Sequence, residues 1–560
     1  MLPRWLEIMG PASWPSARGD GRPVGRHRSA KLLRQQAATF SMAVLCDLDR
    51  DRPDRDYLRQ RVRESLVGWQ ASLRSDGLPL QRRMRSDLYH GVTLYHVLQT
   101  LTETVGFQTP MLLGDIERHV RWIARGNTGT AWLEATTICA LTDCSALVRD
   151  TRPLHTARER LRLLLATQNE EGWFADAGGV DVGRLSLTID ALARIRRNHH
   201  WPELDEPIEK ALQFITHFVH PDGSTGGCYN TYNTTFISPA GVECLAPEFA
   251  DASLLALHMR RQFDGDLISD RLDVGTCAVL GAGVSAARIE AGNLPNADRE
   301  LPCTQTGTTR FPEAGLIIVS NAAFHAVISE RKAGAIHVSW RKGIPLDDPG
   351  VGVIGLRSVT RSGRFDGRTR SMFAPDDEDS PQVIMRCTGI LRRSENLPIS
   401  WRDRIKRMVR RLTKRLEFGR VTAGQQIDPR VEQLLISYAG APITANDETR
   451  RDERTPPDSR RPRMDWRRLT HDYFQREIRV ADQTIQILDR IACRIGCHTL
   501  VLQSLGDDGE ALIAECTGAS SHPRPALFVE FGRMVQVVRR YRDGLLVDAE
   551  GAPSARYNEL

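Results

Sequence analysis

Two glycine-rich segments carry most of the side chains in this sequence that could do chemistry. The second of them, residues 220–246, places two tyrosines and two asparagines within five residues, namely Tyr229, Asn230, Tyr232 and Asn233. Tyrosine can transfer protons as an acid or a base, and asparagine can hold a carboxylate and stabilise developing negative charge. We therefore predict that Tyr229 and Asn230 are catalytic and that Tyr232 and Asn233 contact the substrate. The alternative for the asparagines is a role in turns.

An earlier segment supplies further acid–base groups. Tyr89 and His90 lie at the expected start of a helix, after a charged and glycine-containing stretch. Neighbouring side chains on a helix point about 100° apart, so only one of the two can face a cleft squarely. We predict that His90 is catalytic and that Tyr89 contacts the substrate. The alternative for His90 is a structural histidine with satisfied hydrogen bonds.

The first glycine-rich segment, residues 168–190, combines an aromatic pair with acidic and basic side chains. Trp173 could stack on a sugar ring, or it could anchor the core after a helix. Asp176 and Asp181 could bind hydroxyl groups, or they could cap the next helix, because aspartate is a preferred N-cap residue. Arg184 completes the predicted substrate contacts, since arginine favours two-point contacts with carboxylate, phosphate or sulfate.

These segments need a scaffold, and the apolar spacing from about residue 30 to 263 is helical. It indicates about eight or nine helices with short connections. Three of the expected helices end in a glycine-containing loop, at Gly77, Gly172 and Gly223, where the lack of a Cβ permits the left-handed conformation. Antiparallel helix pairs with functional loops at one end predict an α/α toroid, an incomplete barrel of helix pairs, over residues 31–265.

The pattern changes near residue 310 to short β-branched runs separated by turn signals, which predicts an antiparallel β-sandwich over 310–560. We expect residues 1–30 to be disordered and 266–309 to be a linker with one short helix. The charged, proline-rich stretch 446–463 is predicted to be a mobile loop. The stretch 401–418 is predicted to be a basic amphipathic helix, which could lie on an anionic membrane or polymer or dock on the sandwich.

Charge and cysteine content exclude several classes of protein. The formal net charge is only +6 over 560 residues, and the basic helix alone is a thin basis for a nucleic-acid partner, so none is expected. The eleven cysteines have no ligand or disulfide spacing, and no phosphate-loop, dinucleotide or HExxH motif is present. We therefore expect no metal and no cofactor. Without a signal peptide or a run of about 18 apolar residues, a cytoplasmic protein is expected.

A helical toroid followed by an antiparallel sandwich resembles the heparinase II/III-like polysaccharide lyases and related bacterial exopolysaccharide proteins. The segments that carry the resemblance are EGWFADAGGVDVGRLSLTIDALA (171–193), HPDGSTGGCYNTYNTTFISPAGVECLA (220–246) and FPEAGLIIVS (311–320). Residues that match the family pattern are Trp173, Asp181, Tyr229, Asn233, Pro239 and Glu243. Residues that depart from it are Ala177 and Arg184, each in place of a tyrosine, Cys228 in place of a glutamate, and Thr231-Tyr232 in place of Ser-Arg.

The resemblance implies a lyase that cleaves an anionic, uronate-containing polysaccharide by β-elimination. Such an enzyme neutralises the substrate carboxylate, removes the C5 proton and protonates the leaving oxygen, and Tyr229, Asn230 and His90 could take these roles. The departures favour the alternative, a non-catalytic polysaccharide-binding or assembly protein of exopolysaccharide or capsule biosynthesis. Expected partners are the anionic polysaccharide itself, exopolysaccharide assembly proteins, and an anionic membrane surface that the basic helix could contact.

Overall fold

The computed structural model divides into two compact units, residues 1–327 with 339–341, and residues 328–338 with 342–560. The residues that it describes are 25–75, 90–104, 106–126, 128–176, 179–264, 274–290, 300–343, 345–350, 352–354, 358–361, 370–375, 383–390, 392–396, 473–492, 498–501, 526–529, 534–543 and 545–547. Tyr89, the basic stretch 401–418 and the stretch 446–463 lie outside the described residues.

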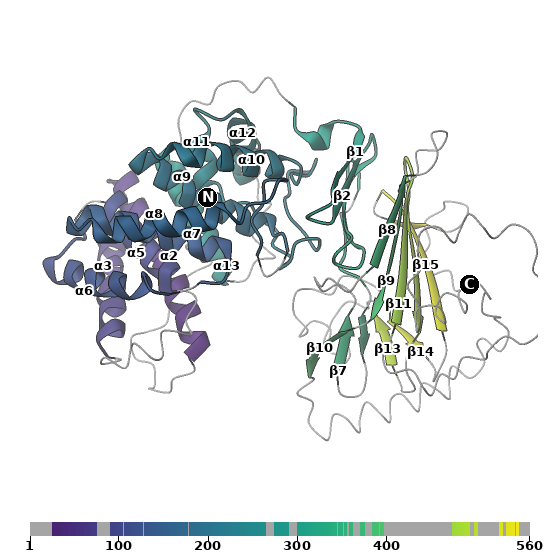
Figure 1. The fold of residues 1–560 in the computed structure, drawn as a ribbon, viewed down its shortest axis with the longest axis horizontal. Helices are drawn as coiled ribbons and strands as arrows, with labels where there is room; N and C mark the ends of the chain where they lie inside the picture. The colour runs from purple at the N-terminus through teal and green to yellow at the C-terminus, as the bar shows by residue number, and fades with distance from the viewer. Residues whose placement is uncertain are drawn as a thin grey trace, which may run out of the picture. The chain divides into compact units, whose positions relative to one another are not determined.

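Figure 1 shows the helices of the first unit. Their packing contacts place them alternately along the chain in an inner and an outer layer. The described inner helices are α2 (Gly25–Leu48), α5 (His90–Glu103), α7 (Ala131–Val148), α9 (Val182–His199), α11 (Ala240–Leu245) and α13 (Val274–Glu290). The described outer helices are α3 (Arg55–Ser75), α6 (Pro110–Ile123), α8 (Arg152–Leu165), α10 (Asp205–Thr216) and α12 (Ala250–Asp264), and the short 3₁₀ turns are η3 (Pro202–Leu204) and η4 (Pro302–Thr304).

The inner helices form a ring. Each one packs against the next inner helix, and α13 packs back against α2, so the ring is closed within the described residues. Because the chain alternates between inner and outer helices, the inner helices run in one direction, and their first turns lie at the same end. The predicted α/α toroid is confirmed. The end at which the inner helices begin is called the mouth below.

Two inner helices are longer than we expected for their segments. Helix α13 exceeds the one short helix expected within the linker 266–309, and α2 begins inside the expected disordered segment 1–30. The sequence of α13, VGTCAVLGAGVSAARIE, is apolar on most sides and rich in glycine and valine, which are weak helix formers. A helix that is covered on all sides needs no polar face, so the periodic signal of an amphipathic helix is missing.

Glycine conformation was predicted correctly where the structure describes it. Gly172 and Gly223 have φ of +94° and +88°, whereas Gly77 lies outside the described residues. A Cβ added at Gly172 would lie 2.3 Å from the backbone carbonyl oxygen of Lys210 in α10. Both the backbone angle and the close approach of α10 therefore require glycine at this position.

We expect Gly172→Ala to lower the free energy of unfolding by about 1–3 kcal/mol, because the methyl group adds left-handed strain and a clash with backbone. Gly114→Ala is the matched control, since a Cβ at this position of α6 would meet nothing within 4 Å. Alanine is the better helix former, so this variant should gain up to about 1 kcal/mol. Urea denaturation followed by circular dichroism measures both; equal stability of Gly172→Ala and the wild type would contradict the packing argument.

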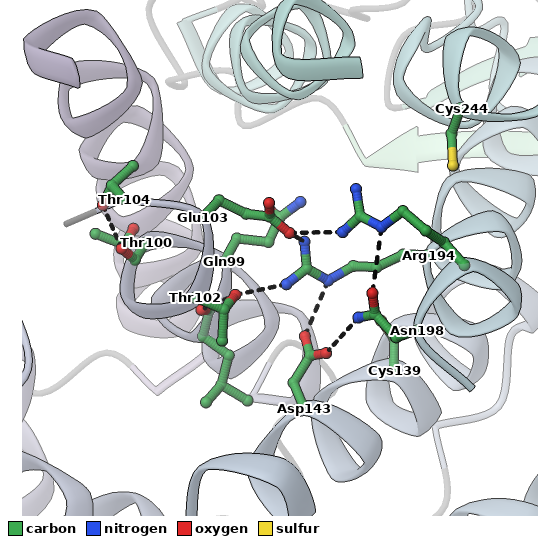
Figure 2. A network of polar contacts seen from close by, with 12 residues as sticks. Gln99, Thr100, Thr102, Glu103, Thr104, Cys139, Asp143, Arg194, Asn198 and Cys244 are labelled. Carbon is green, nitrogen blue, oxygen red and sulfur yellow. Dashed lines mark hydrogen bonds and ion pairs between the residues drawn. The ribbon is translucent and has the colours of Figure 1, made fainter. Parts of the chain in front are cut away.

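A buried ion network joins three inner helices toward their C-terminal ends (Figure 2). Arg194 of α9 donates from Nε to Asp143 of α7 at 2.9 Å, from Nη2 to Thr102 of α5 at 2.6 Å, and from Nη1 to Glu103. Arg197 adds a second bond to Glu103 at 2.7 Å. Burial alone would raise the pKa of Glu103, but the two guanidinium groups outweigh it and the pKa is lowered. The network fixes the inner helices at the end opposite the mouth.

The remaining described elements are strands in antiparallel ladders. They are β1 (Gly307–Phe311), β2 (Leu316–Ser320), β3 (Phe324–Ser329), β4 (Ala335–Trp340), β5 (Leu346–Asp348), β6 (Gly352–Ile354), β7 (Ser358–Arg361), β8 (Arg370–Pro375), β9 (Val383–Ile390), β10 (Arg392–Asn396), β11 (Tyr473–Val480), β12 (Ile485–Ala492), β13 (His498–Val501), β14 (Ala526–Val529), β15 (Met534–Arg542) and β16 (Leu545–Val547). Their sheets have the orders β1-β2-β3-β4-β5, β10-β7-β6-β13-β14 and β16-β15-β12-β11-β9-β8.

A fully buried ion triad ties two of these sheets together. Arg476 of β11 lies opposite Asp489 of β12 and donates to it from Nε at 2.7 Å and from Nη2 at 3.0 Å. Its Nη1 reaches Asp348 of β5 at 3.0 Å. Contact between the faces of two antiparallel sheets is the packing of a β-sandwich, so the predicted fold class is confirmed in its C-terminal part as well.

Candidate functional site

The two glycine-rich segments meet at the start of α9. The backbone N–H of Thr231 donates to the carbonyl oxygen of Val180 at 2.9 Å, and that of Tyr232 donates to Asp181 Oδ2 at 2.9 Å. Asp181 is also the N-cap of α9, because its Oδ1 accepts from the N–H of Arg184 at 3.0 Å. Both segments connect an outer helix to an inner one, so the sequence brings them together at the mouth of the toroid.

Four side chains around this junction form the mouth cluster, which we define as Trp132, Asp176, Arg184 and Tyr232. The guanidinium carbon of Arg184 lies 3.2 Å from the centre of the Tyr232 ring and 5.8 Å from that of Trp132. Arg184 Nη1 lies 3.2 and 3.3 Å from the two carboxylate oxygens of Asp176. Tyr232 is 40% exposed, so an arginine stacked on an accessible ring is presented to solvent.

Burial gives the acidic member of the cluster an unusual titration. Asp176 is 3% exposed, and burial raises its pKa to about 6, against the attraction of Arg184 and with a smaller contribution from the negative charge of Asp181. Near neutral pH the Asp176–Arg184 pair therefore carries no net charge, and in mild acid it becomes positive.

A narrow pocket lies among the inner helices α5, α7, α9, α11 and α13, with Trp132 in its wall. Its volume of about 20 Å³ leaves room for about one ordered water molecule and not for a sugar ring. The polar side chains in the wall include Tyr95, His96, Gln99 and Asp190. Gln99 joins two of them, since its Oε1 lies 3.0 Å from His96 Nδ1 and its Nε2 donates to the Tyr95 hydroxyl at 2.9 Å.

The ionisable groups of this pocket are held neutral or nearly so by burial. Burial lowers the pKa of His96 to about 4, with Gln99 opposing the shift, and it raises the pKa of Asp190 to about 7. The Asp190 carboxylate accepts from the hydroxyl of Ser238 and from the N–H of Gly241 at 2.6 Å. These bonds tie α9 to the start of α11, which is a structural role.

Tyr229 and Asn230, the predicted catalytic pair, are in the interior, and neither has exposed surface. Asn230 uses its Oδ1 to accept from the N–H of Val182 at 2.9 Å and its Nδ2 to donate to the carbonyl oxygen of Thr234 at 2.7 Å. Its amide therefore holds the two segments together. The catalytic prediction requires access to a polymer, which this packing does not give.

Tyr229 takes part in a chain of polar contacts that sequence reasoning missed. Its hydroxyl lies 3.4 Å from Nε2 of His220, and Nδ1 of His220 lies 2.9 Å from the hydroxyl of Ser224. Ser224 in turn donates to Asp222 Oδ1 at 2.7 Å, and Asp222 is exposed. The ring of His325, from β3, lies 5.8 Å from that of His220. The chain thus runs from the surface to a buried phenol.

The other predicted residues have structural contacts. His90 begins α5 and packs its ring edge-on against His119 and Trp122 of α6, at 5.4 Å in each case, and it shares no described contact with Tyr229 or Asn230. Trp173 is buried in the core and donates from its indole N–H to Glu171 at 2.9 Å. The core-anchor alternative thus describes Trp173.

Asn233 and Asp181 have the structural roles that were named as alternatives to substrate binding, a turn for Asn233 and a helix cap for Asp181. Asn233 has φ of +54° and closes a turn by donating its N–H to the carbonyl oxygen of Asn230 at 3.1 Å. Asp181 caps α9. Among the described residues, no group of three or more His, Cys, Asp and Glu could hold a metal ion. No described helix combines the length and apolar character that crossing a bilayer would need.

No known family model matches the chain, and no curated protein matches it. Solved structures with a similar fold include the chondroitin AC lyase of Streptomyces coelicolor A3 in complex with chondroitin sulphate, with a TM-score of 0.42 and 10% identity over 90% of this chain and 71% of that chain. A mutant of the heparan sulfate lyase HepC from Pedobacter heparinus has a TM-score of 0.36 and 10% identity over 90% of this chain and 70% of that chain.

A GH127 β-L-arabinofuranosidase from Geobacillus stearothermophilus T6 is also similar, with a TM-score of 0.33 and 10% identity over 71% of this chain and 89% of that chain. The scores and identities are low, and the names of these proteins describe both lyases and a glycosidase.

Proposed function

We propose that this protein binds an anionic, uronate-containing polysaccharide at the mouth of its helical toroid and does so without cleaving it. The observation that carries the proposal is the stacking of Arg184 on the exposed ring of Tyr232, 3.2 Å from guanidinium carbon to ring centre. A guanidinium group recognises a carboxylate through two parallel hydrogen bonds, and an aromatic ring offers its face to the apolar face of a sugar.

The orientation of Arg184 leaves hydrogen-bonding capacity for a ligand. Both of its contacts with Asp176 come from one nitrogen, Nη1. The side chain is 21% exposed. A ligand carboxylate can therefore reach the guanidinium from the solvent side without moving the backbone.

Binding to a panel of polysaccharides tests this function. Polygalacturonate, alginate and hyaluronan carry carboxylates, whereas dextran is neutral. Isothermal titration calorimetry with size-defined fragments should give binding to at least one of the acidic chains and none to dextran. Binding that is equal for dextran and for every acidic chain, or absent for all of them, would contradict the proposal.

A second candidate function is a lyase that acts by β-elimination, and the contact between Tyr229 and His220 favours it. A phenol beside an imidazole is a pair that can take up and release a proton. Two features oppose this candidate: Tyr229 has no exposed surface, and the pocket among the inner helices is too small for a sugar ring. Catalysis would require the second glycine-rich segment to open.

We expect the wild type and Tyr229→Phe to bind the acidic polysaccharide with the same affinity and to release no unsaturated uronate ends. The variant keeps the ring that stacks on Phe218, at 5.6 Å between ring centres, and loses only the hydroxyl. Ultraviolet absorbance of unsaturated ends measures turnover, and calorimetry measures affinity. Turnover by the wild type that the variant abolishes would instead establish the lyase.

A further inference from the structure

Resting on the proposed function, we infer that Asp176 is an internal competitor for the polysaccharide, a carboxylate of the protein that occupies the guanidinium of Arg184 until a ligand carboxylate or a proton displaces it. Asp176 thereby sets the affinity of the mouth cluster and makes it depend on pH. This contact regulates the proposed site. It also makes the site bind strongly charged polysaccharides more tightly than weakly charged ones.

Asp176 contacts the guanidinium group of Arg184 through one of its nitrogens. Both carboxylate oxygens of Asp176 lie within 3.2–3.3 Å of one guanidinium nitrogen, Nη1 of Arg184. The remaining faces of the guanidinium are turned to Tyr232 and to Trp132. A sugar carboxylate that approaches Arg184 therefore meets a cation whose charge is already compensated, and it is repelled by the aspartate beside it.

Asp176 is held in place by its own backbone as well as by Arg184. Its N–H donates to the carbonyl oxygen of Gly179 at 2.7 Å, and the N–H of Gly179 donates back at 3.1 Å. These backbone hydrogen bonds hold Asp176 in position, and they remain when its carboxyl group is protonated and uncharged. Protonation can release the cation without unfolding the segment.

The charged and titratable groups that face Asp176 are Arg184 of α9, Asp181 at the cap of α9, and Tyr232 of the second glycine-rich segment. Burial and the negative charge of Asp181 favour protonation of Asp176, and the positive charge of Arg184 opposes it. Burial raises the pKa of Asp176 to about 6, so the proton is absent at pH 7.5 and present at pH 5. A uronate, with an acidity near that of an α-carboxyl group, stays ionised at pH 5. The protonated form of the protein is the better binder, and by linkage a bound anion raises the pKa of Asp176 further.

We expect the wild type to bind an acidic polysaccharide at least about tenfold more tightly at pH 5 than at pH 7.5. The reason is that a ligand which raises the pKa of Asp176 by one unit binds the protonated protein about tenfold more tightly than the unprotonated protein. Asp176→Asn should bind at pH 7.5 with the affinity that the wild type reaches at pH 5. The affinity of this variant should change little between the two pH values. Heparin serves as a second probe, since its sulfate groups keep their charge over this range.

Asp150→Asn is the matched control for the charge. Asp150 is paired with an arginine, Arg152, through contacts of 2.8–3.1 Å, and it lies between α7 and α8, at the end of the toroid opposite the mouth. This variant should keep the pH dependence of the wild type. The midpoint of thermal unfolding, measured for each variant at both pH values, shows whether the fold is intact. The comparison of wild-type binding at pH 5 and pH 7.5 does not depend on any variant.

The outcomes separate the two proposals. No binding by any form at either pH contradicts the proposed function itself. Binding that depends on Arg184, but is equally tight at both pH values and unchanged in Asp176→Asn, contradicts the role of Asp176 and leaves the function standing. A pH dependence that Asp150→Asn removes as fully as Asp176→Asn does would also contradict it, since the effect would then follow from overall charge.

Discussion

Replacing Arg194 with methionine is expected to cost about 3–5 kcal/mol of unfolding free energy, a large share of the stability of a typical domain. The reason is the pair of carboxylates that the guanidinium serves. Asp143 is 3% exposed and Glu103 is 15% exposed in their side chains. Without Arg194, Asp143 loses the cation that compensates it and Glu103 keeps only Arg197, whereas methionine fills most of the space.

Arg152→Met is the control for this prediction, because it removes an arginine that is also paired with an aspartate but is 77% exposed. An exposed pair contributes between zero and about 1 kcal/mol. Urea denaturation followed by tryptophan fluorescence compares the variants. The buried tryptophans of the first unit include Trp69, Trp132 and Trp173. Equal midpoints for Arg194→Met and Arg152→Met would show that the network in Figure 2 does not hold the ring together.

The second large effect is expected for binding. Arg184→Gln should weaken the binding of an acidic polysaccharide at pH 5 by about tenfold to a hundredfold, since a hydrogen bond to a charged group contributes about 1.5–3 kcal/mol. Glutamine keeps a polar side chain of similar length and cannot supply a positive charge. Calorimetry at pH 5 is the measurement, because Asp176 then competes least.

Arg152→Gln is the matched control here, since it removes the same charge from the end of the toroid opposite the mouth. It should bind as the wild type does. Tyr232→Ala should weaken binding less than Arg184→Gln, because it removes the stacking surface and leaves the cation. If Arg184→Gln and Arg152→Gln bind equally well, Arg184 does not contact the ligand, and the mouth cluster is not the site.

Much of the fold could be predicted from sequence because its signals are local. Amphipathic spacing marks most of the helices, and β-branched runs with turn residues mark the strands. The length of helix α13 and its place in the ring were missed because it is covered on several sides by other elements, α2 and α11 among them. Its burial is decided by the closure of the ring, which depends on contacts between segments more than 200 residues apart, and no local window contains that information.

The candidate site, like the fold, could be predicted from the sequence only in part. The role of Asp181 as a cap follows from residue type and from position at the start of a helix, and the ligand contact of Arg184 stays a prediction. Tyr229 and Tyr232 are three residues apart in the same segment, yet one has no exposed surface and the other is 40% exposed. The difference arises because Tyr229 stacks on Phe218, which also contacts Phe311 of β1. The spacing of the tyrosines does not predict such packing between a helix, a loop and a strand.

The central claim, that an acidic polysaccharide binds at the mouth cluster, is tested most directly by locating the ligand. Hydrogen–deuterium exchange with mass spectrometry can compare the protein at pH 5 with and without a saturating uronate oligosaccharide, with back-corrected rates. We predict slower exchange in peptides that cover residues 179–188 and 230–236, and no change in those that cover 148–158 at the opposite end. Protection confined to other parts of the chain, with these peptides unchanged under saturation, would contradict the account.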